Sequence, residues 1–522
     1  MSERINTVTI VGGGSAGWIT ALVLTTMLNR AEKNRIRVTL IESPRIPNIG
    51  VGEGTVTGFS RLLRQLEIDE NEFMLKSDAT FKCAGRFRGW QTGDEGKPVT
   101  FYNPFMEGGY VEGFQTYYYH QKYGAGGRNL IQATQPTIEM VERGLSPKLV
   151  GSRPYDSKVP YTYHLNAKAF SEQLASIAKQ RGVEYIQDEM LDVELDERGY
   201  ISALKLEEKG RYPVQFVIDC TGFRGRILHH ALGEPFLDYG KHLLCDRAIS
   251  LPVPHRNANH IQPCTTAIAL SSGWVFNVPL QSRMGTGYIY SSAHKSDDEA
   301  LHELKQHLGD IAPDDATPPV IRMNIGRVRN TWVKNCVACG LSAGFVEPLE
   351  ATAIFTIEQT ARHLSFYFPE FGIDEHAVAK FNELLDAQYR EVLDFIVMMY
   401  YTSNRDEPFW KSAREDIEVP DTLMNNLELW KHYLPNANDI PGRFLFSFWN
   451  YYFILAGRGY FNQAHYPGEN MLRKQSWENL LNRAEPGIAN VLRQLPTHTD
   501  YLNSIKKPRT GKKVLYSVNY KQ

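Results

Sequence analysis

A glycine-rich turn near the N-terminus has the residue types and the spacing that hold a dinucleotide. A β-branched run, residues 7–11, leads straight into Gly-Gly-Gly-Ser-Ala-Gly, and the apolar segment 18–28 follows. A buried strand, Gly-x-Gly-x-x-Gly and a helix, in that order, let the backbone approach a pyrophosphate and let the helix pack on the strand. The helix N-terminus then offers free N–H groups to the phosphates. The residues predicted to form this site are Gly12, Gly14, Ser15, Ala16 and Gly17.

An acid at the end of the next predicted strand supports this interpretation. The strand covers residues 36–42 and ends in Glu42. A carboxylate there accepts hydrogen bonds from a ribose 2′-hydroxyl, which argues against a 2′-phosphate. The alternative is a glycine-rich turn that holds no ligand, and the strand, the helix and the terminal acid together disfavour it.

The same fingerprint serves FAD and NAD, and a later segment favours FAD. Residues 217–224 read as a buried strand that ends in Asp219 and a glycine turn. Many FAD enzymes of the hydroxylase type carry such a segment, which returns near the first nucleotide site. No second Gly-x-Gly-x-x-Gly follows a predicted strand, so no dedicated NAD(P)H domain is expected. A bound flavin would then be reduced by another protein or by transiently bound nicotinamide.

Size, charge and cysteine content exclude several classes of protein. A chain of 522 residues predicts two or three packed subdomains. A net charge of −2 gives no field that favours nucleic acid or an anionic membrane, and the basic run 506–513 is interpreted as a solvated tail. No apolar stretch approaches the roughly 20 residues that span a bilayer, and no signal peptide is expected. Cys336 and Cys339 lack the second pair that a zinc site needs, so no metal is predicted, and a reducing cytoplasm fits the scattered cysteines.

The elements that must position these residues follow from hydrophobic periodicity. Residues 58–72 and 165–181 predict helices, and residues 183–213 predict a small antiparallel sheet. Residues 245–330 are rich in strands, and the chain becomes helical and aromatic from Thr356 onward. The expected fold class is α/β (α+β), with a Rossmann-like FAD-binding domain of the aromatic-hydroxylase type, an added sheet and a mostly helical C-terminal substrate region. The predicted division is 1–100 plus 160–355 for the FAD-binding domain and 101–159 plus 356–522 for the substrate-covering domain.

Several segments, taken in their order and spacing, resemble the flavin-dependent tryptophan halogenase family. The resemblance covers residues 5–360 well and the remainder loosely. It implies a halogenase that uses reduced FAD, oxygen and chloride, bromide or iodide to make hypohalous acid, with the reduced FAD supplied by a separate flavin reductase. The matching segments are Gly12–Trp18, Ile49–Thr55, Ala79–Gly85, Tyr163–Asn166, Asp219–Arg224, Gly273–Leu280, Gly285–Ser292, Trp332–Gly340 and Gly344–Thr352.

The resemblance implies two catalytic residues. Lys82 matches an essential lysine, and a confined ammonium or haloamine directs the halogen to one carbon. If the amine must be nucleophilic, burial would have to lower its pKa. Glu350 matches a glutamate that stabilises the cationic arene and accepts its proton. Glu347, three residues earlier, is interpreted as structural.

Further residues are assigned through the same resemblance. The backbone N–H groups of Thr352 and Ala353 match a halide site, an amide nest for an anion. This chain has Ala351 and Ala353 where family members often have Ser and Gly, which leaves the halide preference open. The residues implied to contact the flavin, besides the glycine-rich turn and Glu42, are Gly52, Glu53, Asp219 and Leu349.

The substrate pocket should be aromatic, because stacking holds a flat arene. Trp274 and Phe276 stand in the family's Trp-x-Trp-x-Ile-Pro motif, which lies beside the flavin and keeps substrate away from it. Asn103 stands where tryptophan-specific members commonly have His, with Phe105 two residues later. The remaining candidates for the wall are Trp449 and Tyr451, although aromatics at helical spacing also suit a core.

The substrate and the competing functions stay open at this stage. No pattern for gripping the amine and carboxylate of free tryptophan is found, so indoles, phenols or a larger aromatic product are expected at least as much as free tryptophan. An FAD-dependent aromatic monooxygenase is the main alternative, and a non-catalytic flavin-binding protein is a weaker one. A small-molecule aromatic substrate and a flavin reductase are the expected partners, without nucleic acid or membrane, and the sequence is compatible with a homodimer.

Overall fold

The computed structural model describes residues 4–29, 35–46, 52–93, 96–440, 442, 444–461, 464–465 and 468–506. Most of the basic run 506–513 and the first three residues of the Ile49–Thr55 segment lie outside these ranges. No helix in the described ranges is both long enough and apolar enough to cross a membrane.

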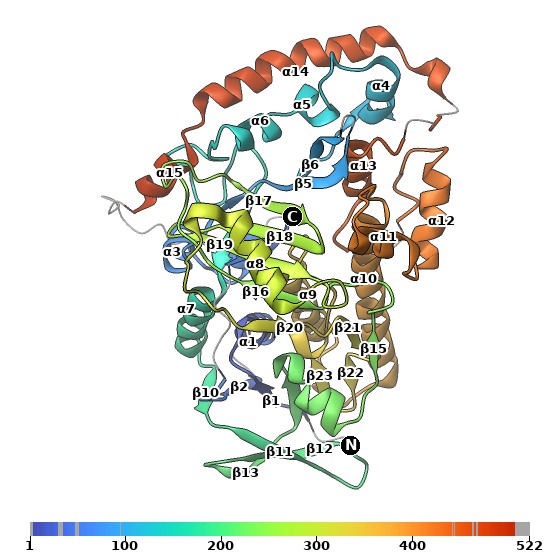
Figure 1. Ribbon diagram of the computed structural model, residues 1–522. Helices are drawn as coiled ribbons and strands as arrows, with labels where there is room; N and C mark the ends of the chain where they lie inside the picture. Colours follow the sequence, from blue (N-terminus) through green and yellow to red (C-terminus); the bar gives the residue numbers. More distant parts are fainter. Residues whose placement is uncertain are drawn as a thin grey trace.

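A six-stranded sheet carries the glycine-rich turn (Figure 1). Its order is β10-β2-β1-β14-β23-β22, and every pair except the edge pair β22–β23 is parallel. Val11 is paired with Asp219, so the turns that follow β1 and β14 meet at the carboxyl edge of the sheet. The strands are β1 Thr7–Val11, β2 Arg37–Glu42, β10 Glu184–Gln187, β14 Phe216–Asp219, β22 Trp332–Val333 and β23 Cys336–Ala338.

Helix α1, Ser15–Leu28, is buried along most of its length. It packs against α9, Ala353–Phe366, and against α7, Ala167–Gln180. Every residue from Gly17 to Leu24 is buried, which suits a helix that is apolar on all sides. The packing brings the N-termini of α1 and α9 to one region of the molecule.

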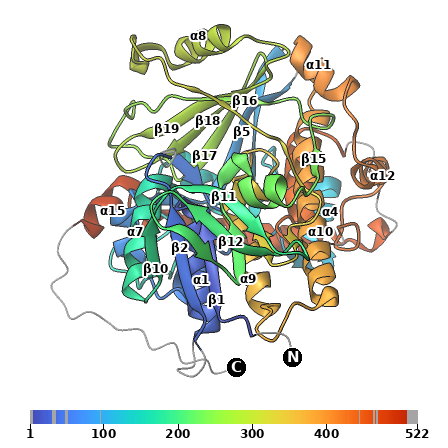
Figure 2. The same ribbon diagram turned by 90° about the horizontal axis from the view of Figure 1, so that it is seen from below.

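A seven-stranded sheet forms a second layer, which Figure 2 shows apart from the parallel sheet. Its order is β20-β16-β19-β18-β17-β5-β6, and only the β17–β5 pair is parallel. A three-stranded sheet, β3-β9-β4, lies beside it. The strands of these two sheets are β3 Gly52–Gly54, β4 Thr80–Lys82, β5 Ala84–Thr92, β6 Pro98–Pro104, β9 Thr162–Asn166, β16 Arg247–Ser250, β17 Cys264–Leu270, β18 Gly273–Pro279, β19 Met284–Tyr290 and β20 Val320–Arg322.

The C-terminal region is helical, as the sequence predicts. Helix α13 packs on β6, where a Cβ built at Gly457 would lie 2.5 Å from Cβ of Phe101. Helix α14 runs across one end of the molecule above α4 and α5 (Figure 1). The helices are α10 Glu375–Tyr401, α11 Pro408–Glu415, α12 Asp421–Trp430, α13 Phe448–Gly457, α14 Lys474–Gln494 and α15 His498–Ile505.

The structure corrects several predicted elements. The helix expected at 58–72 is two helices, α2 Phe59–Gln65 and α3 Glu70–Lys76, because Glu67 is left-handed with φ of 51°. Strand β10 joins the parallel sheet, so only β11 to β13 form the antiparallel sheet expected at 183–213. Region 245–330 also holds a helix, α8, which begins with a capping box of Ser296 and Glu299. The elements not yet bounded are α4 Thr116–Tyr123, α5 Leu130–Thr134, α6 Thr137–Glu142, α8 Asp297–Leu308, β7 Tyr110–Val111, β8 Phe114–Gln115, β11 Met190–Leu195, β12 Ile201–Leu206, β13 Gly210–Pro213, β15 Phe236–Asp238, β21 Gly326–Val328 and β24 Gly344–Phe345.

Candidate active site

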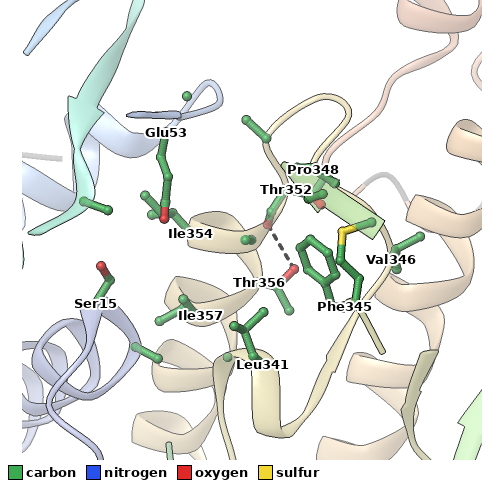
Figure 3. Close-up of a pocket in the computed structure, with 18 of the residues that line it drawn as sticks. Ser15, Glu53, Leu341, Phe345, Val346, Pro348, Thr352, Ile354, Thr356 and Ile357 are labelled. Atoms are coloured by element: carbon green, nitrogen blue, oxygen red, sulfur yellow. Dashed lines mark hydrogen bonds between the residues drawn. The ribbon is translucent and has the colours of Figure 1, made fainter. Parts of the chain in front are cut away.

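One cavity of about 420 Å³ brings most of the predicted site residues together. It runs from the glycine-rich turn to the N-terminus of α9, and its walls come from both sheets. Figure 3 shows Ser15, Glu53 and Thr352 around it, from three different elements. The predicted residues that line it are Gly12, Gly14, Ser15, Ala16, Glu42, Gly52, Glu53, Lys82, Trp274, Phe276, Leu349, Glu350, Thr352 and Ala353.

The glycine-rich turn has the geometry of a phosphate cradle. A Cβ built at Gly12, where φ is +122°, would lie 2.1 Å from the carbonyl oxygen of Cys220. A Cβ at Gly17 would lie 1.9 Å from the carbonyl oxygen of Gly12, so the helix packs tightly under the turn. Gly14 is the N-cap of α1 and supplies no side-chain cap, which leaves the first N–H groups of the helix for a ligand. These residues fit the diphosphate of a dinucleotide.

The Glu42 carboxylate lies against the same turn. A Cβ built at Gly13 would be 2.2 Å from Oε1 of Glu42, and Tyr185 donates a hydrogen bond to Oε2 at 2.9 Å. Burial, and to a smaller extent the Glu42 carboxylate, raises the pKa of Tyr185 to about 12, so the phenol keeps its proton. Tyr185 belongs to β10, which the sequence did not place in this sheet, so its role as the orienting donor was missed.

Asp219 shapes the turn that follows β14. Its side chain is fully buried, and its Oδ1 accepts from the backbone N–H and the hydroxyl of Thr221 at 2.9 and 2.7 Å. Its Oδ2 accepts from the N–H groups of Ile227 and Leu228 at 3.0 and 2.9 Å. These four bonds use the carboxylate to shape the turn after β14, and Asp219 does not line the cavity. The neighbouring Cys220 and Thr221 line the cavity instead.

Lys82 ends strand β4 with its ammonium inside the protein. The residue is 1 % exposed, and its Nζ donates to the backbone carbonyl of Thr55 at 3.1 Å. The Nζ also lies 5.6 Å from the ring centroid of Phe105. Burial lowers the pKa of Lys82, and the Glu350 carboxylate opposes that shift. The direction agrees with the requirement for a nucleophilic amine.

A buried histidine stands beside Lys82 and has one defined tautomer. The Thr80 hydroxyl donates to the carbonyl oxygen of Pro279 at 2.5 Å, so it must accept its second bond, of 3.0 Å, from Nδ1–H of His164. The remaining nitrogen, Nε2, then accepts from the Thr265 hydroxyl at 2.9 Å. Burial, together with the charge of Lys82, holds the pKa of His164 well below its usual range, which keeps the ring neutral. Thr265 lines the cavity and was not predicted.

Glu350 lies in the loop between β24 and α9, in an unusual backbone conformation. Glu350 and Ala351 are consecutive left-handed residues, with φ of 69° and 56°. Each costs of order 1–3 kcal/mol, which the surrounding structure must offset. The Glu350 carboxylate accepts a hydrogen bond from Nδ2 of Asn103 at 2.8 Å and lies over the backbone of Gly85. Burial raises the pKa of Glu350, whereas Lys82 and Asn103 lower it.

The predicted halide residues begin helix α9. Thr352 is the N-cap and Ala353 the first helical residue, and no side chain caps the helix. The free N–H groups at this end of α9 and the positive end of the helix dipole therefore favour an anion in the adjoining part of the cavity. Ala353 adopts ordinary helical geometry, so the replacement of glycine there costs nothing. The strained backbone instead falls on Glu350 and Ala351, which the sequence did not reveal.

Trp274 and Phe276 form one wall of the cavity. Their ring centroids are 6.3 Å apart, and the Phe276 ring lies over Gly287, where a Cβ would be 2.6 Å from it. The Trp274 indole donates to Oε1 of Glu347 at 2.7 Å, and the Tyr400 hydroxyl donates to the same oxygen. Burial raises the pKa of Glu347 to about 7. Both bonds hold Glu347 against the Trp274 wall, an arrangement that suits the structural interpretation from the sequence.

Four predicted substrate-pocket residues lie off the cavity lining. Asn103 is 2 % exposed and bonded to Glu350, and Phe105 faces Lys82. Tyr451 is buried between Phe395 and Trp430, at 5.0 and 5.2 Å between ring centroids, so it packs in the core of the helical region and does not line the cavity. Trp449 is 1 % exposed and packs on Tyr117, which places it in the aromatic core of the helical region.

Cysteines and possible metal ligands are scattered among the described residues. These residues contain no group of three or more His, Cys, Asp or Glu side chains arranged to hold a metal ion. All six cysteines are free, and five of them are buried.

The fold and the site define a flavin-dependent halogenase, and comparison with known proteins supports this class. The tryptophan halogenase family model matches residues 7–474, and the chain belongs to that family. The chain is 36% identical over 475 residues to tryptophan 6-halogenase SttH from Streptomyces toxytricini, covering 87% of this chain and 89% of the relative. It is 32% identical over 538 residues to tryptophan 7-halogenase RebH from Lentzea aerocolonigenes, covering 96% and 99%.

Solved structures of flavin-dependent halogenases share the fold of this chain. The crystal structure of SttH superposes with a TM-score of 0.90 at 34% identity, covering 96% of this chain and all of that one. BrvH, a flavin-dependent halogenase from Brevundimonas, superposes with a TM-score of 0.85 at 31% identity, covering 96% and 99%. The protein is therefore a flavin-dependent halogenase of an aromatic substrate with a mixed α/β fold, and the monooxygenase and non-catalytic alternatives give way.

Proposed function

We propose that the protein binds FAD along the cavity, with the diphosphate on the Gly12–Gly17 turn and the ribose at Glu42. Gly52, Glu53 and Leu349 would line the flavin portion. The fit of the glycine cradle and the uncapped N-terminus of α1 supports this assignment. When bound, reduced FAD would supply two electrons to oxygen, and the reduced oxygen would oxidise the halide to hypohalous acid with release of water.

We assign the halide to the N–H groups of Thr352 and Ala353 at the start of α9. Lys82 holds the electrophilic halogen near the arene, either as a hydrogen-bond donor to hypohalous acid or as the amine that carries the halogen. Glu350 stabilises the positive charge on the arene and takes the displaced proton. The observation that carries this assignment is that Lys82, Glu350 and both halide residues line the same cavity as the glycine-rich turn.

The substrate is proposed to be an electron-rich indole or phenol. The ring of Phe105 beside Lys82 suits a flat aromatic compound. The relatives SttH and RebH are named for different positions of tryptophan at similar identity, so they do not fix the site of halogenation here. Asn103, which stands where tryptophan-specific members have His, is hydrogen bonded to Glu350 rather than open to the substrate.

We further propose that a separate reductase supplies reduced FAD, that the enzyme works in a reducing cytoplasm, and that it forms a homodimer. Six free cysteines fit a reducing compartment. Residues 1–100 with 160–355 are assigned to flavin binding of the Rossmann-like, aromatic-hydroxylase type, and residues 101–159 with 356–522 to covering the substrate.

A screen by mass spectrometry tests the proposed function. Purified protein is given reduced FAD, oxygen, one of chloride, bromide or iodide, and a panel of indoles and phenols. Halogenated products that depend on the halide are expected. An oxygenated product formed without halide would identify a monooxygenase instead, and no halogenated product from any member of the panel would contradict the substrate class.

A further inference from the structure

We infer that Asn103 and Asn450 form a directional chain of side-chain amides that positions the Glu350 carboxylate from helix α13. This deepens the proposed function and rests on the assigned role of Glu350. Asn103 and Asn450 are positioning residues, because they act on the arene only through Glu350. The two asparagines are 347 positions apart in the sequence.

The direction of the chain is fixed at its far end by a backbone group. The N–H of Ser447 donates to Oδ1 of Asn450 at 2.8 Å, and a backbone N–H can only donate. The other amide atom of Asn450, Nδ2, therefore donates to Oδ1 of Asn103 at 2.9 Å. The Nδ2 group of Asn103 is then left to donate to Oε1 of Glu350 at 2.8 Å. Turning either amide over would break two of these bonds.

Helix α13 is itself fastened to α10 just before this point. The carboxylate of Glu391, on α10, accepts from the backbone N–H groups of Phe444, Leu445 and Phe446 at 2.8, 2.7 and 2.9 Å. These three bonds fix the segment that leads into Ser447, the N-cap of α13. The amide chain is therefore anchored at its outer end by two helices and at its inner end by β6, which carries Asn103.

The surroundings of Glu350 explain why such a chain matters. Strand β4 contributes the Lys82 ammonium, β5 the backbone of Gly85, and β6 the Asn103 amide. Lys82 is the one charged side chain among the described residues that shifts the pKa of Glu350. The amide donor favours the carboxylate over the acid, and it holds Oε1 of Glu350, a residue that lines the cavity. Both polar atoms of Asn103 are thereby committed to protein partners.

Asn450→Asp tests the chain without touching Glu350. The new carboxylate keeps the acceptor that caps α13 but loses the N–H that Asn103 needs, so the Asn103 amide turns and presents its oxygen to Glu350. Loss of the donor raises the pKa of Glu350, so activity falls at a higher pH as the solution is acidified. We expect the acid limb of kcat/KM to move to higher pH and kcat to fall roughly tenfold, with oxidation of reduced FAD unchanged.

Asn129→Asp is the matched control. Asn129 is the exposed N-cap of α5 and also belongs to a capping box, so this change adds the same charge at another helix N-terminus, outside the amide chain. Its pH profile should match the wild type. Asn103→Ala should shift the acid limb as Asn450→Asp does, and the double variant should shift it no further, because the chain is already cut. If Asn450→Asp fails to fold, the pH profile of Asn103→Ala alone tests the amide chain.

Different results would contradict the amide chain and the assigned role of Glu350. If Asn450→Asp and Asn103→Ala have the acid limb of Asn129→Asp, the amide chain is overturned while Glu350 keeps its role. If Glu350→Gln keeps full activity and an unchanged pH profile, the assigned role of Glu350 is overturned as well.

Discussion

The two proposed catalytic residues are held in opposite ways. Lys82 ends a paired strand, and its ammonium donates to a main-chain carbonyl. Glu350 lies in a left-handed loop, and its carboxylate is held by a chain of side-chain amides. The amine position is therefore set by backbone geometry, which few substitutions can move. The carboxylate position is set by side chains, so changes outside the cavity can tune it.

The largest expected effect comes from removing the amine. Lys82→Ala should lower the rate of arene halogenation by at least about 10³-fold, because Lys82 is the residue assigned to hold the electrophilic halogen near the arene. Product is measured by mass spectrometry at saturating halide. Lys168→Ala, at an exposed position on α7, is the control and should behave as the wild type. Wild-type halogenation by Lys82→Ala would remove Lys82 from the site.

Removing the carboxylate should cost less and should change the pH profile. Burial raises the pKa of Glu350, and the reaction needs the ionised form, so wild-type activity falls as pH drops through that pKa. Glu350→Gln cannot titrate. We expect kcat to fall about 10²-fold and the acid limb to disappear, as measured by initial rates over a pH series. An acid limb that persists in this variant would show that another group titrates.

Changing a neighbour of Lys82 should affect stability more than chemistry. Thr265→Val removes the hydroxyl that donates to Nε2 of His164 and leaves that buried nitrogen without a partner. The free energy of unfolding should fall by about 1–3 kcal/mol, measured by denaturant titration, whereas kcat should change little. Thr265→Ser should restore the stability. A loss of kcat as large as that of Glu350→Gln would mean that Lys82 also depends on side chains.

The smallest effect is expected at the strained loop. Ala351→Gly relieves a left-handed alanine, and this gain exceeds the entropy that glycine adds to the unfolded chain, so the protein should gain about 0.5–1 kcal/mol of stability. Thermal unfolding measures it. Ala175→Gly, within helix α7, should instead destabilise by about 1 kcal/mol. Equal losses in both variants would contradict the assignment of strain to Ala351.

The sequence predicts the parts of the site that strands and glycine turns position better than the parts that side-chain contacts position. The strand, turn and helix at 7–28, the strand before Asp219 and the convergence of Lys82 with Glu350 on one cavity all follow from local patterns or from the family resemblance, and the structure confirms their placement. Local patterns suffice here because a strand and a glycine turn fix their own geometry.

The parts that side-chain contacts position could not be predicted. The bond between Asn103 and Asn450 joins residues far apart in the sequence, and no local motif marks it. Tyr451 has the aromatic character of a pocket wall, yet only the packing of α10, α12 and α13 shows that it is core. The left-handed pair at Glu350 and Ala351 contains no glycine, so composition gives no sign of it.

The most direct test is a single-turnover reaction that follows flavin and arene together. Reduced FAD, oxygen, bromide and an indole or phenol that the wild type halogenates are mixed with wild type, Lys82→Ala or Asn450→Asp, and flavin absorbance and brominated product are recorded. All three proteins should oxidise the flavin at similar rates. The product per flavin should be high for the wild type, lower for Asn450→Asp at acidic pH and absent for Lys82→Ala. Parallel loss of flavin oxidation and bromination would contradict the separate roles of the flavin cradle and the Lys82–Glu350 pair.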